Sequence, residues 1–422
     1  MSRSSTGGRR LALVSLGVMV GFVLVMAWQT WDRDKLTEIG VQEPGNVEAS
    51  PRPPTARLAH PDAGKVRHFG ADWAPKGMKP PVDPPSGYFE DEDFIKGAAV
   101  GLYMDLPGLS YAQMFQEIRG LGATHVSVVV AWSLRDIRAS KIQPHPTETV
   151  PDAKVREYIR QAHAAGLKVM LFPIVHVERR RTGEWRGKLA PHHPERFWRE
   201  YEAFAMHYAQ LAEEEKVAIL SVGSELLSLE SEKQRWERVI GQVRGVYKGK
   251  LTYSANWDHF DHVTFWDSLD VAGMTGYFEL SDSESPTLEE LRETWDAATD
   301  VIATYPGRAG LPLILTEVGY PSQIGSASHP WDYTKRRTPD PELQYLCFRA
   351  MYEAWVARSA KVGDPDKLGL HGLFVWNWYG YGGAEDGSYT LRGKPAEAIV
   401  RHWFGGPERV QNAPTPEPAP KK

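Results

Sequence analysis

Eight apolar segments, most of them separated by amphipathic helices, constrain the fold of this chain more than any other sequence feature. Because each segment is apolar along most of its length, each is expected to be a strand buried on both faces, as in a parallel sheet. These segments are residues 96–105, 124–132, 167–177, 217–225, 250–257, 269–278, 311–320 and 368–380. Helices are expected at 110–122, 152–166, 194–215, 231–247, 287–305 and 341–358.

This alternation of strand and helix predicts an α/β fold, a single (β/α)8 TIM barrel, for residues 91–406. An open, doubly wound sheet is the competing architecture. That sheet would carry a glycine-rich phosphate-binding turn after an early strand. The first predicted strand instead runs into GLYMDLPGLS, which lacks the G-x-G-x-x-G pattern. The sequence therefore favours the barrel.

The start of the chain is not expected to belong to the barrel. Arg9 and Arg10 precede an apolar run from Leu11 to Trp28, whose length is at the lower limit for a membrane span. Arginines ahead of such a run favour an N-terminus that stays inside the cell. Residues 1–29 are therefore expected to be a transmembrane signal anchor in the inner membrane, with a cleaved signal peptide as the alternative. Either interpretation places the remaining chain on the periplasmic or extracellular side.

Two further segments flank the predicted barrel. Residues 30–90 are rich in proline and lack a hydrophobic period, so they are expected to be a linker. This linker could also wrap the domain through Trp73, Tyr88 and Phe89. Residues 407–422 are expected to be a disordered tail. The small net charge of −5 gives no indication of nucleic-acid binding, and the single cysteine excludes an internal disulfide framework.

Polar and aromatic residues stand at the carboxyl ends of the predicted strands. In TIM barrels these strand ends form the mouth that holds the active site, so the side chains are expected to meet there. The residues are Tyr103, Asp105, Trp132, His176, Glu225, Asn256, Trp257, Tyr277, Glu317, Trp376, Asn377 and Trp378.

Two glutamates among these residues, Glu225 and Glu317, end the fourth and seventh predicted strands and should face each other across the mouth. A single glutamate at a strand end is more often a salt-bridge or loop residue. A pair of carboxylates facing a cleft is what glycoside hydrolysis requires. One carboxyl group protonates the leaving oxygen, and the other attacks the anomeric carbon or activates water. With aromatic residues on neighbouring strands, the pair predicts a glycoside hydrolase.

Six stretches between about residues 95 and 380 carry a family resemblance: HVERRRTGEWRGKLAP, ILSVGSELLS, LTYSANWDHF, FWDSLDVAGMTGYFEL, LILTEVGYPS and GLFVWNWYG. They resemble glycoside hydrolase family 113, the endo-β-1,4-mannanase family in clan A of the retaining glycosidases. The resemblance implies that Glu225 is the acid/base and Glu317 the nucleophile. It also matches Tyr277 to the tyrosine that hydrogen-bonds the nucleophile, and Trp376 to the aromatic floor of the subsite for the attacked sugar.

The chain departs from the clan pattern at two places. Many clan members carry asparagine directly before the acid/base, where this chain has Ser224, as the resembled family has a small hydroxyl residue. Asn256 could supply the missing contact to the substrate. The arginines at 179–181 and the loop QIGSASHPWDYTKRRTPD are less mannanase-like. They could bind an anionic or branched polymer, with a solvated charged loop as the alternative.

Several other residues are weaker candidates for substrate binding. For His176 the alternative is a packing histidine, and for the loop residues Trp185 and Arg186 it is loop packing. The adjacent pair of histidines at 192–193 has poor geometry for one ion, so no metal and no cofactor are expected. The candidates of this group are Trp132, His176, Trp185, Arg186, Trp257 and Trp378.

The expected mechanism is double displacement, in which Glu225 begins protonated because the nearby Glu317 and partial burial raise its pKa. Retaining enzymes of this kind hold the two carboxyl groups about 5–5.5 Å apart. The expected substrate is a β-1,4-mannan-like polysaccharide, and the protein is expected to act as a monomer. Two alternatives stay open. One is a membrane-tethered hydrolase or transglycosylase that trims an exported bacterial polysaccharide, and the other is an inactive polysaccharide-binding barrel.

Overall fold

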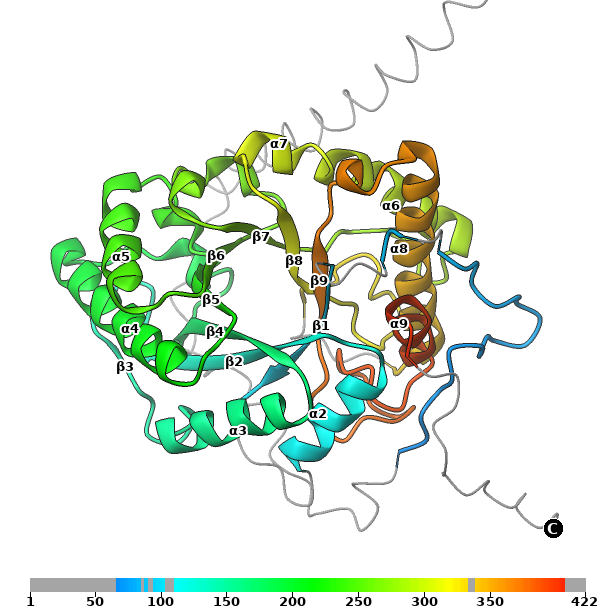
Figure 1. Ribbon diagram of the computed structural model, residues 1–422, viewed down its shortest axis with the longest axis horizontal. Helices are drawn as coiled ribbons and strands as arrows, with labels where there is room; N and C mark the ends of the chain where they lie inside the picture. The colour runs from blue at the N-terminus through cyan, green and yellow to red at the C-terminus, as the bar shows by residue number, and fades with distance from the viewer. Residues whose placement is uncertain (1–65, 85–86, 90–93, 103–109, 333–337, 407–422) are drawn as a thin grey trace, which may run out of the picture. The chain divides into compact units, whose positions relative to one another are not determined.

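Eight parallel strands form a closed ring in the computed structural model, which describes residues 66–84, 87–89, 94–102, 110–332 and 338–406. The strands are β1 (Ile95–Gly101), β2 (His125–Leu134), β4 (Lys168–Val177), β5 (Ile219–Ser224), β6 (Lys250–Ala255), β7 (Val271–Thr275), β8 (Leu313–Val318) and β9 (Gly372–Val375). Each strand pairs in parallel with its neighbours, and β1 pairs with both β2 and β9. A short strand, β3 (Ile142–Gln143), joins β2 in antiparallel fashion. This closure confirms the predicted (β/α)8 barrel (Figure 1).

Helices surround the strands, as Figure 1 shows. They are α2 (Tyr111–Gly120), α3 (Asp152–Ala164), α4 (Pro194–Glu214), α5 (Lys233–Val246), α6 (Leu288–Ile302), α7 (Tyr305–Ala309), α8 (Pro341–Val362) and α9 (Ala396–Phe404). Between β6 and β7, where the sequence shows no long helical pattern, the fully described chain forms only two short 3-10 turns. Local signals place several helix starts. Thr287 and Glu290 form a reciprocal capping box at α6, and the Asp340 side chain accepts from the Leu343 N–H at α8.

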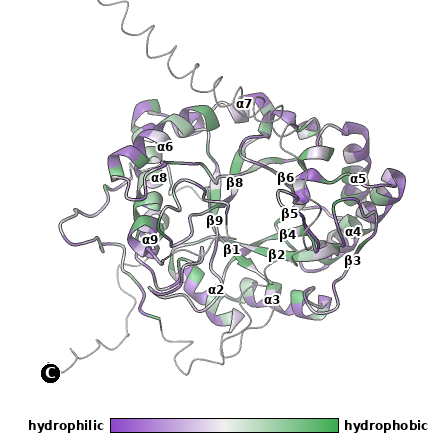
Figure 2. Cartoon of the chain, turned by 180° about the vertical axis from the view of Figure 1, so that it is seen from behind, coloured by the Kyte–Doolittle hydropathy of each residue, from purple (hydrophilic) through white to green (hydrophobic). Residues whose placement is uncertain are grey.

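The core consists of two apolar layers, one inside the barrel and one between the strands and the helices. The inner layer is lined by side chains that alternate along the strands, such as Val129 on β2, Phe172 on β4 and Phe374 on β9. The outer layer contains large aromatic residues, among them the fully buried Trp236 and Trp295. Figure 2 shows the resulting pattern, with apolar strands in the centre and polar residues on the outward faces of the helices.

Residues 66–84, which precede the predicted barrel boundary, contact α8 and α9. Arg349 donates to the Lys79 carbonyl at 2.7 Å, and Tyr352 donates to the Val82 carbonyl at 2.6 Å. The Trp73 ring packs edge-on against Tyr345 with ring centroids 5.4 Å apart. This part of the predicted linker therefore packs on the helices of the barrel.

The predicted membrane anchor, residues 1–29, and the predicted tail, residues 407–422, lie outside the described residues. Within the described ranges, no helix is both long and apolar enough to cross a membrane. The anchor and the domain boundaries drawn from the sequence stay predictions. The single cysteine, Cys347, lies on α8 and is fully buried.

Candidate active site

Glu225 follows the last residue of β5 and is held in an uncommon backbone conformation. Its φ of 53° lies in the left-handed region, which is costly for a residue with a side chain and is found most often at functional sites. The Glu225 N–H donates to the Ser254 carbonyl on β6 at 2.8 Å, and the Leu226 N–H donates to the Tyr253 hydroxyl at 2.8 Å. These hydrogen bonds fix the direction in which a 7% exposed carboxylate leaves the strand.

Glu317 lies within β8, near the carboxyl end of that strand, and is also buried. The hydroxyl of Tyr277, two residues after the end of β7, donates to Glu317 Oε2 at 2.8 Å. This is the hydrogen bond that the family resemblance implied. The Gly276 N–H donates to the Glu317 carbonyl at 2.6 Å, so the backbone beside Tyr277 is tied to the same strand.

Arg186 comes from a 3-10 turn between β4 and α4 (Arg186–Lys188) and forms an ion pair with Glu225. Its Nη2 lies 2.6 Å from Glu225 Oε2, and the Arg186 side chain is only 24% exposed. The Trp185 ring lies so close to Gly187 that a Cβ there would come within 2.5 Å of it. The sequence proposed Trp185 and Arg186 as subsite walls. The structure instead places Arg186 directly against the predicted acid/base.

The electrostatics of the site show that the two glutamates act on each other. Burial and the charge of Glu225 raise the pKa of Glu317 to about 7, while Arg186 and the Tyr277 hydrogen bond favour the ionised carboxylate. The sequence reasoning expected a raised pKa at Glu225 and did not foresee one at Glu317.

A third buried carboxyl group, Glu230, lies behind this pair and was missed by the sequence reasoning. The Tyr253 hydroxyl donates to Glu230 at 2.8 Å, and the same hydroxyl accepts from the Leu226 N–H. Burial raises the pKa of Glu230 to about 7, and the charge of Glu225 contributes in the same direction. The charged sequence around it, ESEK, is typical of a solvent-exposed helix start, so the sequence gave no indication that Glu230 is buried.

The structure brings several other predicted residues to the mouth. Trp376 follows β9 and packs on the inner layer of the barrel. His176 lies near the carboxyl end of β4. Burial lowers the pKa of its imidazole, which favours the neutral form. Asn256 donates to Asp258 and accepts from Thr275. Its amide is therefore engaged with neighbouring loop residues.

The Trp257 ring packs against Phe278 and lies 6.2 Å from the ring of Trp331. Trp331 belongs to the loop after β8 and is 39% exposed. The sequence marks this loop as unusual for a mannanase, but no pattern in it indicated a role for Trp331. Ser224, which stands where many clan members have asparagine, has a buried hydroxyl that is without a hydrogen-bond partner in the described part of the chain.

Two predicted tryptophans do not reach the mouth. Trp378 is fully buried, its Nε1 donates to Glu117 at 3.0 Å, and its ring stacks on His68. The Trp132 ring packs against Phe204 and other aromatic residues of α4, so it faces the helices. Alternation along β2 sends Trp132 to the face opposite the inner Val129, whereas Trp378 lies beyond the end of β9, where the strand period no longer applies. Tyr103 and Asp105 lie outside the described residues. The described ranges contain no group of three or more His, Cys, Asp or Glu side chains able to hold a metal ion.

Comparisons with known proteins agree with this geometry. The sequence model of Glycoside Hydrolase Family 113 matches residues 109–394, which is more than half of the chain. The structure of the GH113 beta-mannanase AaManA from Alicyclobacillus acidocaldarius in complex with ManMIm superposes with a TM-score of 0.64 at 28% identity, covering 76% of this chain and 99% of that one. A structure of a GH113 beta-1,4-mannanase superposes with a TM-score of 0.64 at 25% identity, covering 75% and 100%.

A more distant likeness concerns the fold alone. A mutant form of a Glycoside Hydrolase Family 5 mannosidase from Rhizomucor miehei superposes with a TM-score of 0.53 at 9% identity, covering 77% of this chain and 97% of that one. The search of curated proteins found no significant match. The family model and the structural matches over nearly the full length of the mannanases show that this chain belongs to glycoside hydrolase family 113 and is a mannanase-like glycoside hydrolase.

Proposed function

We propose that the protein cleaves a β-linked, mannan-like polysaccharide with retention of configuration, with Glu225 as the acid/base and Glu317 as the nucleophile. One observation carries the role assignment. Two buried glutamates stand at the carboxyl ends of β5 and β8, and the Tyr277 hydroxyl donates to Glu317 Oε2 at 2.8 Å, the contact that the family resemblance gives to the nucleophile. The mannan-like substrate rests on the resemblance of this chain to the GH113 beta-mannanases.

In the first step, Glu317 attacks the anomeric carbon and the bond to the leaving oxygen breaks. Glu225 gives its proton to that oxygen, so the leaving sugar departs as an alcohol. The Tyr277 hydroxyl, 2.8 Å from Oε2, orients the attacking carboxylate and favours its ionised form. The ion pair between Arg186 and Glu225 opposes this step, because a protonated Glu225 cannot hold it.

In the second step, a water attacks the anomeric carbon, its proton passes to Glu225, and the bond to Glu317 breaks. Glu225 must now be ionised, which is the form that the Arg186 guanidinium stabilises at 2.6 Å. Arg186 would therefore assist the half-reaction in which Glu225 is a base. Neutralisation of Glu317 in the glycosyl-enzyme works in the same direction, because it removes the neighbouring negative charge.

Aromatic rings provide the surfaces on which the polymer would lie. Trp376, whose N–H donates to the carbonyl of Val318 next to Glu317, would form the floor under the attacked sugar. Trp257 and Trp331 lie farther out, on the loops after β6 and β8, with their centroids 6.2 Å apart. A flat apolar ring matches the C–H face of a pyranose, so this pair would hold a more distant sugar unit.

Azide rescue separates the two roles. Glu225→Ala and Glu317→Ala should each lose about 10⁴-fold or more of the activity on polysaccharide. In Glu317→Ala, azide takes the place of the missing nucleophile and should give the α-azide from an activated aryl β-mannoside. In Glu225→Ala the glycosyl-enzyme still forms, and azide, which needs no base, should give the β-azide.

Glu237→Ala, which removes an exposed carboxylate on α5, is the control and should keep full activity without azide products. Swapped anomers would reverse the two roles, and full activity in either mutant would remove that residue from the mechanism. Product analysis on mannan, glucomannan, galactomannan and cellulose tests the substrate. Sugar binding without any product from the wild-type protein would favour the inactive-barrel alternative.

A further inference from the structure

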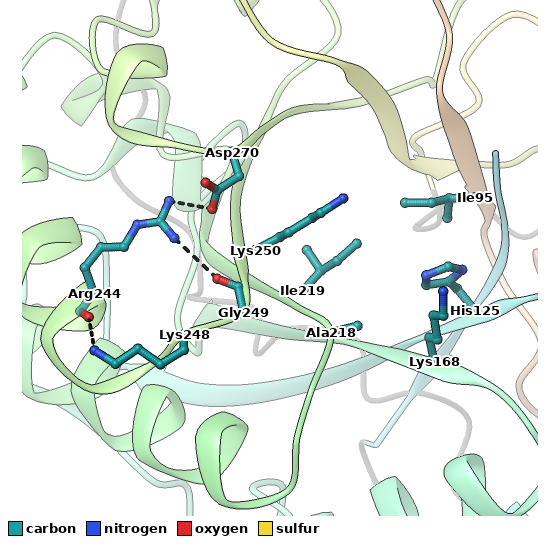
Figure 3. Close-up of a pocket in the computed structure, with 10 residues that line it drawn as sticks. All are labelled: Ile95, His125, Lys168, Ala218, Ile219, Arg244, Lys248, Gly249, Lys250 and Asp270. Atoms are coloured by element: carbon teal, nitrogen blue, oxygen red, sulfur yellow. Dashed lines mark hydrogen bonds and ion pairs between the residues drawn. The ribbon is translucent and has the colours of Figure 1, made fainter. Parts of the chain in front are cut away.

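A cavity of about 320 Å³ opens at the amino-terminal ends of the barrel strands, at the opposite end from Glu225 and Glu317. We name it the amino-end cavity. Its lining includes residues that start strands, among them His125 on β2, Lys168 on β4 and Lys250 on β6 (Figure 3). The remaining charged lining residues are Arg244, Lys248 and Asp270. Ligand pockets in proteins begin at about this volume.

Three nitrogen-bearing side chains occupy positions of these strands that face the barrel interior. Val129 and Phe172 belong to the inner core layer, so residues an even number of places away, His125 and Lys168, point to the same side. His125 and Lys168 are paired in register between β2 and β4. On β6, Ser254 contacts Thr316 across the barrel, which makes Lys250 an inward position as well. Such positions in TIM barrels are usually filled by branched apolar residues.

The positive charge in the amino-end cavity is not neutralised by the residues around it. Asp270, the carboxylate of the lining, is bound by Arg244 and accepts from the Leu251 N–H at 2.7 Å. Lys248 donates to carbonyl oxygens at the end of α5. Within the ranges that the structure describes, neither Lys168 nor Lys250 has a carboxylate partner.

Lys168 and Lys250 both line the amino-end cavity. Figure 3 shows Lys250 extending toward the side of the cavity on which Lys168 and His125 lie. Burial, together with the charges of both lysines, lowers the pKa of the His125 imidazole to about 4. His125 is therefore neutral at pH 7. Its Nδ1 lies 2.8 Å from the Thr124 hydroxyl, which fixes the orientation of the ring.

We propose that the amino-end cavity binds a small oxyanion, a phosphate or carboxylate group on a ligand no larger than a monosaccharide, between Lys168 and Lys250. Oxyanions accept charge-assisted hydrogen bonds from ammonium groups, and such an anion would offset the repulsion between the two lysines. Ile95 and Ile219 form an apolar part of the lining, so a sugar acid or a sugar phosphate fits the mixed surface better than a free inorganic ion.

Calorimetric titration of the full chain tests the site with inorganic phosphate, glucuronate, glucose 6-phosphate and, as the neutral control, glucose. The wild-type protein should bind the three anions and not glucose. Lys168→Met/Lys250→Met should weaken anion binding about tenfold or more. Lys361→Met, which makes the same change on an exposed part of α8, should leave binding unchanged. Hydrolysis of polysaccharide should be the same in all variants, because none of them touches the mouth.

A charge-preserving pair keeps the test decisive if the methionine variant does not fold. Lys168→Arg/Lys250→Arg should retain binding within a few-fold of wild type. Absence of binding to any of the anions in the wild-type protein would overturn the proposal, as would equal weakening by Lys361→Met. Binding to vesicles of anionic lipid, without binding to the free anions, would also overturn a small-ligand site and would point to a membrane surface.

Discussion

The two ends of the barrel carry charged side chains of opposite sign, and these side chains differ in whether the protein supplies their partners. At the carboxyl end, Glu225 is paired with Arg186 and Glu317 accepts a hydrogen bond from Tyr277. At the amino end, Lys168 and Lys250 line a cavity in which Asp270 is already bound to Arg244. At the carboxyl end, each glutamate therefore has a partner from the protein itself, and each contact has a short, defined geometry. The difference indicates that the carboxyl end is organised to control proton transfer, whereas the amino end is suited to accept a charge from outside.

Tyr277→Phe should have the largest effect among the substitutions that leave both glutamates in place. The hydroxyl lowers the pKa of Glu317, so its loss should raise that pKa above the value of about 7. Because Glu317 must be ionised to attack, the acid limb of the pH dependence of kcat/KM should move to higher pH. Activity near pH 6 should fall by about 100-fold.

The matched control is Tyr352→Phe, which removes a hydroxyl bonded to the Val82 carbonyl at α8, away from the mouth. Its pH profile should coincide with that of wild type. An unchanged profile in Tyr277→Phe would show that the hydrogen bond to Glu317 does not control the nucleophile. The comparison between the two ends would then lose its main support.

Arg186→Met should have the next largest effect. The guanidinium stabilises the Glu225 carboxylate by a charge-assisted hydrogen bond, and this carboxylate is the base of the second half-reaction. The second half-reaction should slow, and kcat should fall by about tenfold while the glycosyl-enzyme accumulates. A burst of aryl alcohol release, followed by slow turnover, is the measurement. Arg358→Met, which breaks the ion pair with Asp300 on the outer surface, should show neither change.

The residues of the site could be predicted from the sequence to different extents. Glu225, Glu317 and Tyr277 follow or end apolar strands, and the barrel sends such residues to one mouth, so strand position alone located them. The contact of Arg186 with Glu225 links residues 39 apart through an irregular loop, and no periodicity reports such a contact. Trp378 shows the converse case, because a strand-end tryptophan turned out to be buried against Glu117.

The amino-end cavity was not predicted for a related reason. Three strands start with His125, Lys168 and Lys250. A charged residue at the start of a strand is usually an ordinary solvent-exposed residue, so none of them indicated a site. Only the register between β2 and β4 and the closure of the ring place them around one opening. Sequence patterns indicate which face of an element is apolar, but the meeting of charges from different strands depends on tertiary geometry.

Trp331→Ala should have a smaller effect that depends on substrate length. The exposed ring lies beside Trp257 on the loop after β8, so it should contribute only to binding of distant sugar units. On polysaccharide, kcat/KM should fall about threefold to tenfold, and on a short aryl β-mannoside it should not change. Equal loss on both substrates would mean that Trp331 supports the fold of the loop and is not a subsite.

Glu230→Gln should have the smallest effect on activity and should appear in stability instead. The pKa of Glu230 is raised from an ordinary 4.5 to about 7, so the folded state binds this proton more tightly than the unfolded state does. As pH rises from about 4.5 through about 7, the folded state therefore loses stability relative to the unfolded state at this residue.

Glutamine removes this loss of stability, because it does not ionise, and it can still accept a hydrogen bond from the Tyr253 hydroxyl. Its advantage in Tm should be absent near pH 4.5 and should grow to the equivalent of about 2 kcal/mol at pH 8. Glu284→Gln, in an exposed loop, should show no such growth. A constant difference between Glu230→Gln and wild type at all pH values would mean that this buried carboxyl group does not titrate in that range.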